Sequence, residues 1–290
     1  MHELRIEIHR EQQELSVPFH QWLSADGSIW CSFHRSQNGF LLRFPNQADF
    51  KIYSDGSIVQ CWPMLGVATA NINQLYLNQI LPLVQSHSGE LVFHASSIAV
   101  NDHAIVFVGT SGRGKSTLAA SFSNNHYQFL TDDGLLIQKV GTLYQVAPSH
   151  PSIRLWEDSQ LAILGDDVLP EAPLDYTSKL RFPATNRMLH CEKPCKLHRV
   201  YFLGDKVIEE VKFTKLTAQE AMVELIKHSF LLDVEDRRTM SSHFSAVSKM
   251  CTLDIYYRLD YPRHYDQLAN TRRIILEHAG LNKICSPIDT

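Results

Sequence analysis

The spacing of apolar and polar residues divides the chain into a strand-rich front, a mixed middle and a helical end. Over residues 3–67, short alternating runs are interrupted by pairs of a polar residue and a glycine. The pairs are Asp26-Gly27, Asn38-Gly39 and Asp55-Gly56. Glycine accepts the positive φ that tight hairpin turns need, so the pattern predicts a small antiparallel β unit.

The middle of the chain mixes helical and strand patterns. Residues 71–85 carry apolar side chains at helical spacing, and Pro82 is expected to kink or split that helix. Two apolar runs follow at residues 91–100 and 104–108, joined by a turn. They predict a hairpin in a mostly buried sheet, with His94 inside its first strand.

The last part of the chain is helical over residues 216–280. Thr217 and Glu220 have the spacing of a capping box, and Gly280 suits the C-cap of the final helix. Further upstream, residues 165–177 are polar and contain two prolines, which predicts a mobile loop.

These patterns indicate an α/β (α+β) fold with two domains. We expect a β-rich N-terminal domain over residues 1–88 and a larger domain over residues 89–290, which includes the helical segment 216–280. A chain of 290 residues fits two domains, since a typical domain has roughly 150 residues. The front domain and the loop at 165–177 are the natural places for recognition of a substrate or partner, because loops on a rigid scaffold usually carry specificity.

Composition excludes several classes of protein. The chain has 27 basic and 31 acidic side chains, a formal charge of -4, so it is not a strongly basic nucleic-acid binder. No apolar run approaches the roughly 20 residues of a membrane helix, and the first residues lack the apolar core of a signal peptide. The cysteines are scattered rather than densely spaced. We therefore expect a cytoplasmic protein that binds neither nucleic acid nor a membrane.

One motif carries phosphate chemistry, between the buried strand 104–108 and a predicted helix over residues 116–124. It matches the P-loop pattern G-x-x-x-x-G-K-[ST] as Gly109-Thr110-Ser111-Gly112-Arg113-Gly114-Lys115-Ser116, followed by Thr117. The glycines let successive backbone N–H groups converge on phosphate oxygens, and the helix start adds its dipole. Lys115 is expected to reach the β- and γ-phosphates of ATP or another nucleoside triphosphate, and the Ser116 hydroxyl to bind Mg²⁺.

Two adjacent carboxylates, Asp132 and Asp133, end the next predicted strand. A P-loop enzyme needs one carboxylate near its Mg²⁺, and a second can take a proton from an attacking hydroxyl. A base for an organic hydroxyl suits a kinase better than a hydrolase. The alternative is a solvated turn, because Asp-Asp-Gly also has good turn chemistry.

The segment from Phe93 to Asp133 resembles the catalytic core of HPr kinase/phosphorylase, which has a histidine on the strand before its P-loop and an Asp-Asp pair soon after it. The whole chain is more similar to the HPr-kinase-like proteins that phosphorylate lasso-peptide precursors. Two further segments carry that similarity, Pro151-Ser152-Ile153-Arg154-Leu155-Trp156 and Lys179-Leu180-Arg181-Phe182-Pro183. The resemblance implies an ATP- and Mg²⁺-dependent kinase that phosphorylates a serine hydroxyl of a ribosomal precursor peptide, the C-terminal serine in the lasso systems. The related kinases also form homo-oligomers, a state that the divergent front domain leaves open here.

Carried over by position, the resemblance makes His94 the histidine near the transferred phosphate. It makes Asp132 the general base and Asp133 a metal ligand together with Ser116. The two aspartate roles can be exchanged, and the sequence does not decide between them. Arg181 matches an arginine on a substrate-side loop of the related kinases.

Four of these side chains also have interpretations from their own surroundings. A histidine in an apolar strand is more often a hydrogen-bonded structural residue, but the adjacent P-loop favours catalysis for His94. Lys179 and Arg181 are two residues apart, so on a strand they share a face that can clamp phosphates, or that is simply solvated. Arg154 lies among apolar neighbours and is a candidate anchor for a phosphate or carboxylate.

Two other functions stay open beside the peptide kinase. One is a nucleotide-binding regulatory module with little turnover, in which the P-loop acts as a switch. The other is a small-molecule kinase. The presence of Asp132, Asp133 and His94 together favours an enzyme over a module.

Overall fold

The computed structural model describes residues 2–24, 26–171, 173–206 and 208–281, and its fold is α/β. Its contacts divide the chain into two compact units. Unit 1 consists of Met1–Glu90, Leu174–Thr177 and Phe230–Thr239, and unit 2 consists of Leu91–Pro173, Ser178–Ser229 and Met240–Thr290. Two short segments from later in the chain thus belong to the same unit as the β-rich front.

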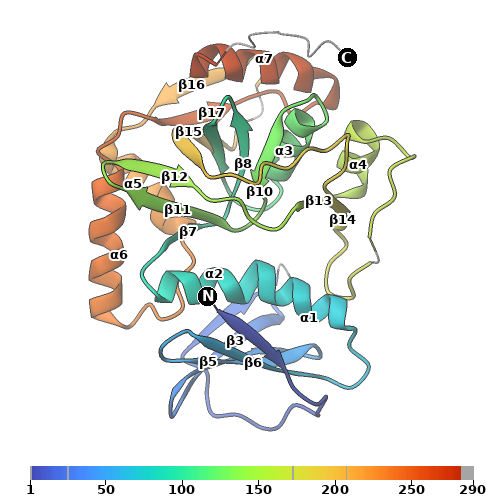
Figure 1. Ribbon diagram of the computed structural model, residues 1–290, viewed down its shortest axis with the longest axis vertical. Helices are drawn as coiled ribbons and strands as arrows, with labels where there is room; N and C mark the ends of the chain where they lie inside the picture. Colours follow the sequence, from blue (N-terminus) through green and yellow to red (C-terminus); the bar gives the residue numbers. More distant parts are fainter. Residues whose placement is uncertain (1, 25, 172, 207, 282–290) are drawn as a thin grey trace. The chain divides into compact units, whose positions relative to one another are not determined.

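Unit 1 contains a six-stranded sheet with a helical run along one face (Figure 1). Its strands are β1 Glu3–Ile6, β2 His20–Leu23, β3 Ile29–Ser36, β4 Gly39–Phe44, β5 Ala48–Tyr53 and β6 Ile58–Pro63. Their order is β1-β6-β5-β4-β3-β2, and every neighbouring pair is antiparallel except β1 and β6. The prediction of a wholly antiparallel unit is therefore wrong at one edge, because side chains alternate with period two in both kinds of sheet.

The helical run of unit 1 changes its hydrogen bonding at the predicted place. It consists of α1 Thr69–Leu75, a π-helical turn η1 Tyr76–Ile80 and α2 Leu81–His87. Leu81 N–H donates to the carbonyl of Tyr76, five residues back. Pro82 follows at the start of α2, where a proline is tolerated. The predicted split at Pro82 is confirmed as a change of helix type.

Unit 2 is built on a nine-stranded mixed sheet. The strands are β7 Leu91–Phe93, β8 Ala95–Val100, β9 His103–Val108, β10 Gln128–Thr131, β11 Leu135–Val140, β12 Leu143–Val146, β15 Cys195–Leu203, β16 Lys212–Lys215 and β17 Tyr256–Asp260. A separate pair consists of β13 Ser152–Leu155 and β14 Leu180–Pro183. The helices of this part of the chain are α3 Lys115–Ser123, α4 Glu157–Ile163, α5 Ala218–Lys227, α6 Arg237–Met250, the 3-10 turn η2 Tyr265–Gln267 and α7 Leu268–Ala279.

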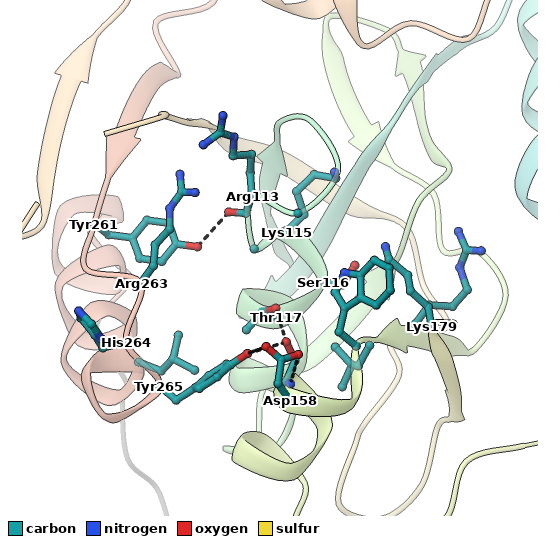
Figure 2. A pocket seen from close by; sticks show the side chains of 17 residues that line it. Arg113, Lys115, Ser116, Thr117, Asp158, Lys179, Tyr261, Arg263, His264 and Tyr265 are labelled. Atoms are coloured by element: carbon teal, nitrogen blue, oxygen red, sulfur yellow. Dashed lines mark hydrogen bonds between the residues drawn. The ribbon is translucent and has the colours of Figure 1, made fainter. Parts of the chain in front are cut away.

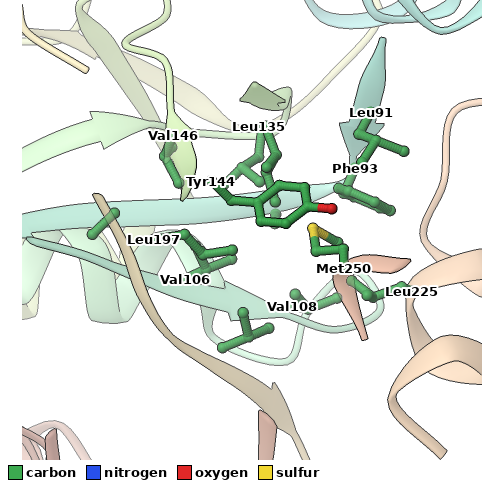
Figure 3. Close-up of a cluster of buried hydrophobic side chains, with 14 of the residues drawn as sticks. Leu91, Phe93, Val106, Val108, Leu135, Tyr144, Val146, Leu197, Leu225 and Met250 are labelled. Carbon is green, nitrogen blue, oxygen red and sulfur yellow. The ribbon is translucent and has the colours of Figure 1, made fainter. Parts of the chain in front are cut away.

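Side chains of the large sheet alternate between two apolar cores. In β8, Ala99 packs in a cluster with residues of α5 and α6, whereas Ile98 packs in a second cluster with residues of α3 and α7. Figure 3 shows part of the first cluster, where Phe93, Val106 and Met250 converge. The sheet is buried on both faces, as its continuous apolar runs predict.

Three parallel strands bring the candidate site to one edge of this sheet. β9, β15 and β17 are parallel neighbours. The P-loop follows β9, Gly204 follows β15, and Asp260 ends β17. Gly204 and Asp260 touch closely, since a Cβ on this glycine would overlap the aspartate side chain. Loops after parallel strands meet at the carboxyl edge, which is where ligands bind in α/β sheets.

The structure corrects the expected position of His94. Residues 91–100 do not form one strand, because β7 ends at Phe93 and β8 begins at Ala95. The His94 N–H donates instead to the carbonyl of His228 at 2.7 Å. The hairpin register is as expected, since Ala95 lies opposite Val108 at the end of β9. His94 therefore stands at a break in the sheet, beside the start of the P-loop.

The two helix-capping signals in the second half of the chain are confirmed. Thr217 and Glu220 form the predicted capping box of α5, and Gly280 caps α7 with φ 69°. No helix or strand is described between α4 and β14, the stretch that holds the loop expected at residues 165–177. Among the described residues, no helix is both long and apolar enough to cross a bilayer.

Candidate active site

The P-loop forms the turn between β9 and α3. Gly112 and Gly114 take φ values of 78° and 93°, and Gly114 is the N-cap of α3. Lys115 is buried, and its ammonium donates to the carbonyl oxygens of Gly109 at 2.7 Å and Thr110 at 3.2 Å. The lysine is thus folded back over the loop, where phosphate oxygens can replace the two carbonyls.

Asp132 accepts hydrogen bonds from three directions. Ser116 Oγ donates to its Oδ1 at 2.7 Å, Ser96 Oγ donates to the same oxygen at 2.6 Å, and Arg154 N–H donates to Oδ2 at 3.0 Å. Burial and the charge of Asp133 raise the pKa of Asp132, although the bonds from Ser96 and Arg154 oppose this. A carboxylate beside the P-loop serine is the arrangement in which P-loop proteins hold Mg²⁺.

Asp133 has different partners. Its Oδ2 accepts from the Arg154 guanidinium, and its Oδ1 lies 3.3 Å from Nε2 of His94. Burial alone would raise the pKa of Asp133, but Arg154 and His94 outweigh it and hold the pKa well below the usual range. The His94 side chain is 37% exposed and the Asp133 side chain only 3%. The imidazole is therefore the member of this pair that a substrate can reach.

A cavity of 270 Å³ opens beside the first turn of α3 (Figure 2). Three of its lining residues form a chain of polar contacts: Thr117 Oγ1 lies 3.3 Å from Ser159 Oγ, and Ser159 Oγ lies 3.0 Å from the Tyr265 hydroxyl. That hydroxyl donates to Asp158 at 2.9 Å. Trp156 and Tyr265 also line the cavity and are 43% and 39% exposed. Both aromatic side chains have surface available for a planar group.

The structure gives different surroundings to the two cations expected to act together. Lys179 lines the cavity, with Nζ 5.7 Å from the Trp156 ring centroid, and it precedes β14. Arg181 lies within β14, pairs with Glu171 at 2.7 Å and donates to Ser152 Oγ at 3.0 Å. Arg181 is not among the residues that line the cavity. Of the pair, Lys179 is therefore the one that lines the cavity beside the P-loop.

Two contributors were missed in the sequence. Ser96 holds Asp132, and its signal was a hydroxyl inside an apolar strand, two residues after His94. His228 follows α5 and meets His94 through its carbonyl. Burial, with the charges of Lys115 and His94, lowers the pKa of His228 to about 4. No motif marks His228, because only the tertiary fold brings it to the P-loop.

The residues present suit a magnesium ion that is held jointly with a nucleotide. Mg²⁺ bound to nucleotides usually takes one or two protein oxygens, phosphate oxygens and water. Ser116 Oγ and Asp132 Oδ1 are hard oxygen donors 2.7 Å apart. Within the described ranges, no group of three or more His, Cys, Asp or Glu side chains could hold a metal ion alone. Asp133, the ligand that the resemblance implied, is engaged by Arg154 and His94.

Comparisons with known proteins add one structural similarity. No protein-family model matches the sequence, and no curated protein matches it. Among solved structures, the Hpr(Ser) kinase/phosphatase from Coxiella burnetii is similar at 10% sequence identity and a TM-score of 0.31. The match covers 65% of this chain and 94% of that chain. At these values the function of this chain has to be inferred from its own site.

Proposed function

We propose that this chain is a nucleotide-dependent kinase that transfers a phosphoryl group to a serine hydroxyl of a peptide or protein. One observation carries the proposal: the P-loop, the Ser116–Asp132 pair and the His94–Asp133 pair converge at one edge of the sheet. A phosphate cradle, a metal position and an acceptor-facing imidazole are the parts that phosphoryl transfer needs.

The nucleotide, proposed to be ATP, would lie along the P-loop backbone. Its nucleoside fits the cavity beside Thr117, where Trp156 or Tyr265 can stack on the base. The Lys115 ammonium then leaves the carbonyl oxygens of its own loop for the phosphates that share the transferred charge. Mg²⁺ held by Ser116 and Asp132 would supply further neutralisation of that charge.

We assign the metal role to Asp132 rather than to Asp133, and the role of general base to His94 rather than to either aspartate. Asp132 contacts the P-loop serine, so it takes the metal role. Asp133 is buried and has a lowered pKa, which makes it a weak base but a good partner for an imidazole. His94 would then accept the proton of the serine hydroxyl, and Asp133 would orient and stabilise the resulting cation.

The identity of the acceptor is the finer part of this proposal. The resemblance of residues 151–156 and 179–183 to lasso-precursor kinases supports a ribosomal precursor peptide. The β-rich unit 1 and the stretch at 165–177 are the proposed recognition elements, because neither takes part in the proposed phosphate chemistry.

A nucleotide-consumption assay with different acceptors tests the proposal. Purified protein with ATP and Mg²⁺ is given no acceptor, a serine peptide, the same peptide with alanine, or glycerol. Consumption that depends on the serine peptide supports the peptide kinase. Consumption with glycerol alone favours a small-molecule kinase, and nucleotide binding without consumption favours the regulatory module.

A further inference from the structure

A second cavity, of 590 Å³, lies at the other end of the P-loop. Gly109 and Thr110 line it, and these are the residues whose carbonyl oxygens bind the Lys115 ammonium. Because a P-loop lysine reaches the β- and γ-phosphates, this cavity adjoins the γ-phosphate end of a bound nucleotide. His228 also lines it, and its carbonyl accepts the N–H of His94 at 2.7 Å. A group in this cavity would therefore lie beside the residues proposed to act on the acceptor.

Charged side chains surround this cavity. They are Lys206, Lys212, Lys227, Arg258, Asp205, Glu224 and Asp260. Two of the three carboxylates already have cationic partners. Glu224 pairs with Lys227 at 2.8 Å, and Asp205 pairs with Arg113 of the P-loop at 2.8 Å. These two carboxylates therefore do little to balance the remaining cations.

Three of the cations that line the cavity have no carboxylate partner among the described residues. Lys206, Lys212 and Arg258 are exposed and form no ion pair within the described part of the chain. Of the carboxylates that line the cavity, Asp260 is the one left to balance these three cations. Its Oδ1 is buried without a hydrogen-bond partner among the described residues. Outside the cavity, hydrogen bonds with Thr217 are the main cause that lowers the pKa of Glu220, and the charge of Arg258 adds to this. The cavity wall is therefore positively charged and short of counter-charge.

We propose that this cavity binds the acceptor and selects a peptide whose serine has a carboxylate close to it. The proposal rests on the proposed kinase function and adds the substrate class. An acidic acceptor would be repelled by the phosphates of the nucleotide, and three nearby cations offset that repulsion. The cations come from three separate segments, before, within and after β16, so they surround the cavity rather than mark one exposed strand.

Peptide binding, measured apart from turnover, tests the selectivity. The protein is saturated with Mg²⁺ and a non-hydrolysable ATP analogue, and three labelled peptides of equal length are titrated by fluorescence anisotropy. The first peptide has its serine between glutamates and an amidated C-terminus. The second is the same peptide with glutamines in place of the glutamates. The third also has glutamines but ends in the serine, with a free C-terminal carboxylate. We expect the first or third to bind about tenfold more tightly than the second at low salt, and the difference to shrink at high salt.

The arms of this experiment separate the sources of the carboxylate. Preference for the first peptide assigns it to acidic side chains, and preference for the third assigns it to the chain terminus. Equal binding of all three peptides would overturn the inference. Phosphoryl transfer to the same peptides tests the kinase function separately. Selective binding without transfer would contradict the proposed kinase function alone. Transfer without selective binding would contradict the proposed selection of a nearby carboxylate alone.

A pair of variants places the selectivity in the cavity. Lys212→Gln with Arg258→Gln should weaken binding of the preferred peptide about tenfold, to the level of the glutamine amide, while nucleotide affinity stays unchanged. Lys139→Gln is the matched control, because Lys139 is an exposed cation on β11 that lines neither cavity. Equal peptide affinity in the double variant and in the control would assign the selectivity to another surface.

Discussion

The hydroxyl of Ser116 donates a hydrogen bond to Oδ1 of Asp132 over 2.7 Å, and this contact joins the P-loop to the residue that follows β10. The two oxygens are close enough to share one cation. The adjacent Asp133 is bound to Arg154 and His94 instead. Two neighbouring carboxylates thus have separate environments, which is how a site gives the same chemical group two roles.

Asp132→Asn should weaken Mg²⁺-dependent nucleotide binding about tenfold or more, because the amide keeps the shape of the side chain but loses the charge that a hard cation prefers. Affinity without Mg²⁺ should change little. Titration calorimetry with and without Mg²⁺ checks this. Asp133→Asn is the matched control and should keep the Mg²⁺ dependence; the opposite pattern would return the metal role to Asp133.

Arg154→Met should destabilise the fold by about 3–5 kcal/mol, because it leaves Asp133 buried without its cation. Asp133→Asn in the same chain should restore most of that loss, since no unpaired charge then remains. Urea unfolding of the two single variants and the double variant measures the coupling. Additive losses would show that Arg154 and Asp133 do not depend on each other.

Gly114→Ala and Gly112→Ala should differ although both glycines have positive φ. Each alanine meets backbone strain of about 1–2 kcal/mol in that region. Only at Gly114 would the new Cβ overlap the Tyr261 hydroxyl, whereas nothing lies within 4 Å at Gly112. Nucleotide affinity should therefore fall at least about tenfold further in Gly114→Ala. Adding Tyr261→Phe removes the overlapping hydroxyl and should recover part of the difference; no recovery would contradict a steric cause.

Stability should fall as the pH drops below about 6.5. Burial is the main cause that lowers the pKa of many histidines from 6.5: His34, His150, His190, His198, His228, His243 and His278. Such residues bind protons more readily in the unfolded chain, so the free energy of unfolding decreases as pH falls from about 6.5 towards 4. The melting temperature should be lower at pH 5 than at pH 7.

His228→Gln tests one member of that set, because the pKa of His228 is lowered to about 4. The variant should lose less stability between pH 7 and pH 5 than the parent does. His9→Gln, which changes an exposed histidine, is the control and should follow the parent. A melting temperature that is flat or rises on acidification would contradict the expected direction.

Features set by neighbouring residues could be predicted from the sequence. The capping box of Thr217 and Glu220 and the C-cap at Gly280 depend on a few adjacent positions, as does the P-loop between its strand and helix. The fold class could also be predicted from the sequence, because buried apolar runs and helical spacing are properties of single segments.

Features that depend on distant segments could not be predicted. Arg35 pairs with Asp233 inside unit 1, and no local pattern indicates that residues 230–239 return to the front of the chain. The break at His94 was hidden for the same reason, since its N–H is taken by His228 rather than by a strand. The separate partners of Asp132 and Asp133 likewise required the fold, which explains why their roles stayed open in the sequence.

Phosphopeptide mass spectrometry with Lys115→Ala tests the kinase proposal most directly. The parent protein, given ATP, Mg²⁺ and the serine peptide that it binds best, should add one phosphoryl group to the serine. Lys115→Ala should add none while its far-ultraviolet circular dichroism stays native, because the ammonium that neutralises the transferring phosphoryl is gone. His94→Ala should bind nucleotide within a few-fold of the parent and slow transfer roughly 10²-fold or more. Undiminished phosphorylation by Lys115→Ala would contradict the proposed role of the P-loop and with it the kinase.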